Sequence, residues 1–237
     1  MKVLLLGNSQ IVAIRNAVQR RSDSVNSAAF TFTARPVGSG REILEGLHQI
    51  VENRVVTQSS FYHPLTLGAD TEFGFVGVAA PLYSLGLCAD RGWLNFRPPG
   101  LPVPGTPVSR AAIAAAAVHF QRKTLAFVED LRRVGVRVFV IEAARLFAHH
   151  DVLSSIGLEK VAAVDSIHRS AIMQHLHRAG IPFVPLSASV FDAAGFMLDR
   201  YRSETPGDQN HGNAELGEVV LSSIEGFLAT HGPVSAT

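Results

Sequence analysis

The chain of 237 residues contains a single cysteine, Cys88, and little excess of charge of either sign. One cysteine excludes an internal disulfide and is typical of a reducing compartment. A formal net charge of +1 gives no electrostatic reason to expect nucleic acid or a membrane surface as a partner. The sequence contains no run of about 18 apolar residues that could span a bilayer. No basic segment followed by an apolar stretch precedes the first predicted strand. These absences favour a cytoplasmic protein, with an exported mature form left open.

Apolar residues make up 47% of the chain and charged residues 17%, which is typical of a folded globular protein. No internal repeat and no linker-like change of composition divides the sequence. The length suits one α/β domain with a sizeable core. We therefore expect a single domain over residues 1–237.

The first ten residues form the most informative stretch. Residues 3–6 are all apolar and so predict a strand buried on both faces, as in the centre of a parallel sheet. A turn of Gly7, Asn8 and Ser9 follows, and residues 11–19 then show helical spacing. Ser9 thus lies at the carboxyl end of a strand, where open parallel sheets bind ligands, and beside a helix N-terminus. The alternative is that Ser9 only caps that helix.

Near the other end, Asp208 and His211 are three residues apart in a Gly-rich segment that precedes an apolar helix pattern. At this spacing the carboxylate can accept a hydrogen bond from one imidazole nitrogen and leave the other nitrogen free. That is the base and orienting half of a Ser-His-Asp arrangement. A helix-capping aspartate with a surface histidine is the alternative.

The strand ending in Gly-Asn-Ser, together with the late Asp-Gln-Asn-His-Gly-Asn-x-x-x-Gly, resembles the SGNH (GDSL-like) hydrolase superfamily. The resemblance implies that Ser9 is the nucleophile, His211 the general base and Asp208 its partner. Asn213 and Gly217 match the structural tail of the family's last motif. The motifs cover only the two ends of the chain, but the order of the elements between them agrees with the family.

The resemblance also implies an oxyanion hole, in which one family position does not match. A glycine after the second strand supplies a backbone N–H in the family, and Gly38 or Gly40 could serve here. The family's third strand is followed by Gly-x-Asn-Asp, whose asparagine donates a further hydrogen bond, but this chain has Ala79-Ala80-Pro81. Asn95 is the only asparagine between positions 53 and 210. The predicted oxyanion hole is therefore Ser9, Gly38 and Asn95, with Asn95 as a plain loop residue the alternative.

Five predicted strands alternate with helices along the chain. This order predicts a three-layer α/β/α fold with a five-stranded, parallel, doubly wound (flavodoxin-like) sheet. Two prolines favour an edge position for the last strand. The expected strands are 3–6, 28–34, 73–80, 136–141 and 181–186, and the expected helices are 11–19, 42–54, 109–135, 161–180 and 219–228.

Other segments are expected near the carboxyl ends of the strands. Residues 97–107 include five prolines and predict a stiff loop that forms a lid or wall of the pocket. The alternatives are a plain connector, a protein-contact loop or a cover for the site of a partner in a homo-oligomer. Gln10, Glu142 and Arg145 are the candidate substrate-binding residues, although an ion pair is favoured for the last two. His149 and His150 are adjacent and point apart, so no metal is predicted, nor any cofactor.

The predicted activity is that of a serine hydrolase acting on a small-molecule ester through an acyl-enzyme. An acyl or O-acetyl ester is expected, with an acetylated carbohydrate slightly favoured. Two alternatives remain: a catalytically weak or inactive binding protein of the same fold, supported by the missing asparagine motif, and an acyltransferase that uses the same triad. A nucleotide-binding flavodoxin-like protein is a weaker possibility, because there is no glycine-rich phosphate motif.

Overall fold

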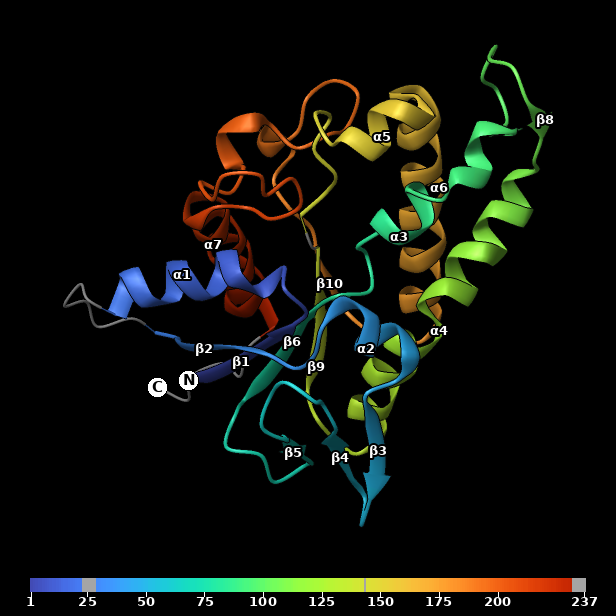
Figure 1. Cartoon of the computed structure of the whole chain (residues 1–237). Helices are drawn as coiled ribbons and strands as arrows, with labels where there is room; N and C mark the ends of the chain where they lie inside the picture. Colours follow the sequence, from blue (N-terminus) through green and yellow to red (C-terminus); the bar gives the residue numbers. More distant parts are fainter. Residues whose placement is uncertain (23–28, 143, 232–237) are drawn as a thin grey trace.

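A computed structural model describes residues 1–22, 29–142 and 144–231, and its centre is a five-stranded sheet (Figure 1). All neighbouring strands pair in parallel, and their order across the sheet is β2-β1-β6-β9-β10. The strands are β1 (Lys2–Gly7), β2 (Thr31–Pro36), β6 (Phe75–Ala79), β9 (Val138–Ile141) and β10 (Phe183–Val184). The predicted doubly wound sheet is confirmed, as is the edge position of the last strand. Ala28, where the second strand was predicted to begin, lies outside the described residues.

The alternation of side chains along β1 divides the interior into two cores. Val3 and Leu5 pack with α1 (Ile11–Ser22) and α7 (Ala214–His231) on one face of the sheet. Leu4 and Leu6 face the other side, in the core formed with α4 (Arg110–Arg133) and α6 (Leu158–Arg178). Figure 1 shows the two helical layers on opposite sides of the sheet. All four apolar side chains of β1 are fully buried, as a central strand requires.

A third apolar cluster joins α4 and α6 to shorter elements beyond the carboxyl ends of the strands, and includes Cys88, Trp93, Ile113, Leu153 and Phe196. The short elements in this cluster are α3 (Leu85–Cys88), η1 (Arg91–Leu94) and α5 (Asp151–Ile156). The other short elements are β7 (Phe96–Arg97), β8 (Thr106–Pro107), η2 (Ala188–Val190) and η3 (Asp199–Tyr201). Within the described ranges, no helix is both long and apolar enough to cross a bilayer.

The helix predicted over residues 42–54 is wrong. Helix α2 covers only Gly40–Glu45, and a small antiparallel sheet follows, of β3 (His48–Val51), β4 (Arg54–Thr57) and β5 (Thr66–Leu67). Gly46 ends the helix at φ +98°, and Glu52 and Asn53 both have positive φ, at 49° and 57°. Two such central residues match the twist of a tight hairpin. The helical spacing was misleading because Ile50 and Val51 are exposed strand residues rather than core residues.

The proline-rich segment 97–107 was predicted to be a lid or wall of the pocket, or else a connector, and the structure does not support a wall. Short strands β7 and β8 pair at its two ends. Figure 1 shows β8 beyond the N-terminal end of α4, across the sheet from α1. None of its residues lines either of the two cavities beside the Ser9 turn. The loop is therefore not a wall of these cavities.

The close crossing of α1 and α7 depends on Gly217, one of the two residues that match the family's structural tail. A Cβ at this position would lie 2.1 Å from the Ala13 carbonyl oxygen and 2.8 Å from Ala17 Cβ. Gly217→Ala must therefore push the helices apart, and we expect it to lower the free energy of unfolding by about 1–3 kcal/mol. Urea unfolding followed by circular dichroism measures this.

Gly226→Ala is the matched control, because it makes the same change in the same helix. Nothing lies within 4 Å of a Cβ at Gly226. Removing a flexible glycine from an open helical position is expected to stabilise by about 1 kcal/mol. If both variants are equally stable, the crossing of α1 and α7 is not as tight as the structure shows.

Candidate active site

The turn after β1 leaves the Ser9 side chain unused. Asn8 Oδ1 accepts a hydrogen bond of 2.9 Å from the Gln10 backbone N–H, and the Asn8 carbonyl accepts one of 3.0 Å from Ile11 N–H. The start of α1 is therefore capped by Asn8, which removes the alternative that Ser9 serves as the cap. Ser9 itself is exposed, and its hydroxyl makes no hydrogen bond to any residue that the structure describes.

Asp208 holds His211 in one orientation. His211 Nδ1 lies 2.9 Å from each carboxylate oxygen of Asp208, so the other ring nitrogen, Nε2, is left free. Asp208 Oδ1 also accepts the backbone N–H groups of Asn210 (3.0 Å) and His211 (3.2 Å). Burial raises the pKa of the Asp208 carboxyl, but the hydrogen bonds from Asn210 and His211 outweigh it and bring that pKa below its ordinary value. Asp208 is therefore ionised at neutral pH and favours a proton on Nδ1.

Ser9, Asp208 and His211 line one cavity of about 290 Å³. The structure thus brings the two ends of the chain together at the carboxyl edge of the sheet. No hydrogen bond joins Ser9 to His211, and such bonds are often long before a substrate binds. The rest of the lining is mainly polar and consists of Val12, Asn16, Arg20, Ser203, Glu204, Thr205, Gly212, Asn213 and Ala214.

Gln10, predicted to bind substrate, lies beneath the site and links its two halves. The side chain is buried, and its Nε2 donates a hydrogen bond of 3.0 Å to the Asn210 carbonyl, 200 residues along the chain. His150 makes a second link to this loop, since its Nε2 lies 3.1 Å from Asn210 Oδ1. Both contacts fix the segment that carries His211. Gln10 does not line the cavity that contains Ser9.

The structure separates the three predicted oxyanion residues. Ser9 lies in the turn, and its backbone N–H donates to no described group. Gly38 is buried against Leu47 and Glu42 and lines neither cavity beside the turn. Asn95 is exposed between η1 and β7, and it too lies outside both cavities.

Tyr83 is a residue beside the Ser9 turn that sequence reasoning missed. Tyr83 follows β6 and lines a second cavity of about 300 Å³, together with Asn8 and Gly40. Burial raises the pKa of the Tyr83 phenol, the nearby Gln10 side chain opposes the rise, and the Asp208 carboxylate adds to it. The raised pKa keeps the phenol protonated at neutral pH. The chain position after β6 was the signal that could have identified it.

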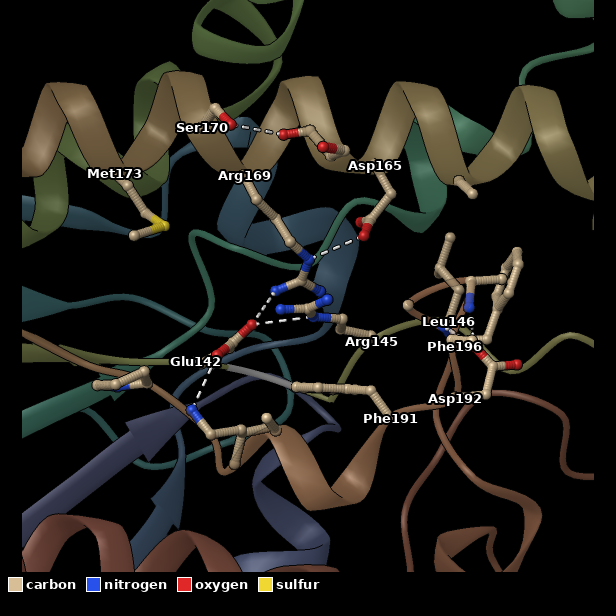
Figure 2. A pocket seen from close by; sticks show the side chains of 18 of the residues that line it. Glu142, Arg145, Leu146, Asp165, Arg169, Ser170, Met173, Phe191, Asp192 and Phe196 are labelled. Carbon is tan, nitrogen blue, oxygen red and sulfur yellow. Dashed lines mark hydrogen bonds and ion pairs between the residues drawn. The ribbon is translucent and has the colours of Figure 1, made fainter.

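Glu142 and Arg145 do form the predicted ion pair, with Arg145 Nε 3.1 Å from Glu142 Oε1. Both lie in a different cavity, between α6 and the segment after β10 (Figure 2). That cavity shares no lining residue with the one that contains Ser9. Across the described residues, no group of three or more histidine, cysteine or acidic side chains could hold a metal ion.

Comparison with known proteins shows which solved structures have a similar fold. No protein-family model and no curated protein sequence matches the chain. Among solved structures, it is similar to a candidate acylhydrolase from Bacteroides fragilis, with a TM-score of 0.56 and 14% identity over 97% of this chain and 87% of the other. It is also similar to a GDSL-like lipase from Bacteroides thetaiotaomicron, with a TM-score of 0.51 and 12% identity over 97% and 88%. At this identity the likeness concerns the fold, which is that of GDSL-like hydrolases.

Proposed function

We propose that this chain hydrolyses an ester through Ser9, His211 and Asp208. The observation that carries the proposal is the shared cavity in which an unused serine hydroxyl lies with a histidine whose Nδ1 is held by an ionised carboxylate. The two residue groups are about 200 positions apart in sequence, so local turn chemistry does not explain their meeting. A nucleophile, a base and a residue that orients the base are the parts needed for acyl transfer.

In the proposed reaction, His211 Nε2 removes the Ser9 proton as the serine oxygen bonds to the ester carbonyl carbon. The bond from that carbon to the alcohol oxygen then breaks, and the alcohol leaves with the proton from His211. Water next gives a proton to His211 as its oxygen bonds to the acyl carbon. The bond from that carbon to the Ser9 oxygen then breaks, Ser9 takes the proton from His211, and the acid is released. Asp208 stays ionised throughout and stabilises the imidazolium.

Three donors are proposed for the oxyanion, of which the Ser9 backbone N–H is the first. The second is Gly40 at the first position of α2, because a first-turn N–H has no acceptor within its own helix. The third is the Tyr83 hydroxyl, in place of the family's asparagine. Gly40 and Tyr83 line the cavity on one side of the Ser9 turn, and His211 lines the cavity on the other. The carbonyl oxygen and the leaving alcohol thus have separate places.

Tyr83→Phe is expected to lower kcat about 100-fold with little change in KM, because it removes one donor and keeps the ring. Steady-state hydrolysis of p-nitrophenyl acetate measures both constants. Tyr62→Phe, at an exposed tyrosine elsewhere, is the control and should match the native chain. An unchanged kcat for Tyr83→Phe would remove this tyrosine from the oxyanion hole.

A short acyl group on a polar alcohol is the proposed substrate. The cavity that contains Ser9 is small, and amide, hydroxyl and charged side chains dominate its lining. Such a lining hydrogen-bonds hydroxyl groups better than it covers a long acyl chain. This supports an acetylated carbohydrate over a long-chain lipid.

Treatment with a fluorophosphonate, followed by intact mass, tests the proposal. An activated serine gives a single covalent adduct, and ester hydrolysis stops in proportion to labelling. A chain that gives no adduct and no hydrolysis of acetate esters is instead a binding protein with the same fold.

A further inference from the structure

The cavity that contains Glu142 and Arg145 has a volume of about 610 Å³, roughly twice that of the cavity beside Ser9. It lies between α6 and the segment that follows β10 (Figure 2). This size is within the range of small-molecule sites. The cavity shares no lining residue with the proposed catalytic site, so its ligand does not depend on the proposed function.

Two carboxylates at its wall already have all the donors they need. Glu142 is buried, and its Oε1 accepts from Arg169 Nη1 (2.9 Å) and from Arg145 Nε (3.1 Å), while its Oε2 accepts from Leu186 N–H (2.8 Å). Asp165 accepts from Arg169 Nε at 2.9 Å and from the Ser84 hydroxyl. Neither carboxylate therefore calls for a cation or another donor.

The two arginines, in contrast, have donors to spare. Arg169 is only 5% exposed, and its Nη2 is buried with no hydrogen-bond partner among the described residues. Arg145 uses only Nε on Glu142, and its guanidinium stacks 3.8 Å from the centre of the Phe191 ring. Figure 2 shows the two guanidinium groups side by side next to Glu142, with Arg169 descending from α6. A buried donor without an acceptor is costly, so these groups are suited to a ligand that brings acceptor oxygens.

Most of the remaining wall is apolar and includes Leu146, Met173, Phe183, Leu186 and Phe196. The last carboxylate of the lining, Asp192, is exposed and bonds to the backbone N–H groups of Ala194 and Phe196. Two arginines and three carboxylates leave the lining with a charge of −1, which opposes a divalent anion such as phosphate more strongly than a monoanion. A single carboxylate on an apolar body satisfies the donors and covers the apolar wall.

We propose that this cavity binds a small apolar monocarboxylic acid, whose carboxylate accepts hydrogen bonds from Arg169 and Arg145. Nothing in this proposal needs Ser9 to be a nucleophile. The site differs from the proposed ester site in both its position and the ligand it recognises.

Calorimetric titration of the full chain with sodium octanoate tests this, with 1-octanol and inorganic phosphate as separate titrants. Octanoate is expected to bind one to one and at least tenfold more tightly than either comparison compound, because only octanoate offers both the charge and the apolar body. Equal binding of octanoate and octanol, or no binding of octanoate, would overturn the proposal. Tighter binding of phosphate would instead indicate a site for inorganic anions.

Two pairs of variants locate the binding. Arg145→Met keeps the stem length and leaves Arg169 on Glu142, and it should weaken octanoate binding about tenfold or more. Arg137→Met is its control, since Arg137 also stacks on a phenylalanine ring, at 4.0 Å from the centre of the Phe75 ring, but precedes β9, at the opposite end of that strand from Glu142. An effect of the same size in both variants contradicts the assignment.

The second pair fills the cavity rather than altering its charge. Ala162 lines the cavity on α6, so Ala162→Leu should weaken binding by obstruction, whereas Ala163→Leu, one residue along the same helix and outside the lining, should not. The fluorophosphonate adduct should form in all four variants. Loss of the adduct with octanoate binding intact would count against the proposed ester hydrolase alone, and the reverse result against this second site alone.

Discussion

Ser9→Ala is expected to abolish the fluorophosphonate adduct. Ester hydrolysis should also fall about 10⁴-fold or more in kcat, because the site then lacks a nucleophile. The reason is geometric: the Ser9 hydroxyl is exposed in the cavity, and no described residue engages it in a hydrogen bond. Losing the hydroxyl should leave stability unchanged, because it makes no contact that supports the fold. Intact mass, turnover of p-nitrophenyl acetate and thermal unfolding measure the three quantities.

Ser203→Ala is the matched control for Ser9→Ala. Ser203 is another serine in the same cavity, and its side chain is close enough to Asp208 to lower the pKa of that carboxyl. If Ser203 were the nucleophile, the adduct would survive in Ser9→Ala and vanish in Ser203→Ala. We expect the opposite pattern, with the adduct kept in Ser203→Ala at a somewhat lower labelling rate.

The features that the sequence predicted well depend on local chemistry. The four consecutive apolar residues 3–6 need cover on both faces of a sheet, which only a central strand provides, and their side chains are all fully buried. Asp208 and His211 are close enough in sequence for one loop to join them, and the 2.9 Å contacts follow from that spacing. Such features are short-range, so a sequence pattern is enough to indicate them.

The features that the sequence did not predict depend on the width of the sheet and on how loops return to it. Glu142 and Arg145 do follow a strand at its carboxyl end, but β6 lies between β9 and β1. Two strand spacings of about 4.8 Å each separate that end from Ser9, and this is enough room for a second cavity. Asn95 was chosen by residue type alone. The segment after β6 turns Tyr83 toward Gln10 and Asp208, and carries Asn95 away to an exposed position.

Asp208→Asn is expected to lower kcat about 10⁴-fold and to change KM little. The asparagine oxygen can still accept the backbone N–H groups of Asn210 and His211, so the loop should keep its shape. Its amide N–H₂ group, however, would face His211 Nδ1 and make that nitrogen an acceptor. The imidazole proton then moves to Nε2, the atom that must take the proton from Ser9, and the base is lost without any change of position.

Asp199→Asn is the matched control, because it makes the same substitution in a second Asp-His pair. His149 Nδ1 lies 3.2 Å from Asp199 Oδ1, and this aspartate is 79% exposed and outside the cavity that contains Ser9. Turnover of p-nitrophenyl acetate should be native in Asp199→Asn, because an exposed pair contributes little and does not touch the reacting atoms. Native turnover in Asp208→Asn as well would mean that His211 does not depend on Asp208 for its tautomer. Asp208 would then have no part in the proposed triad.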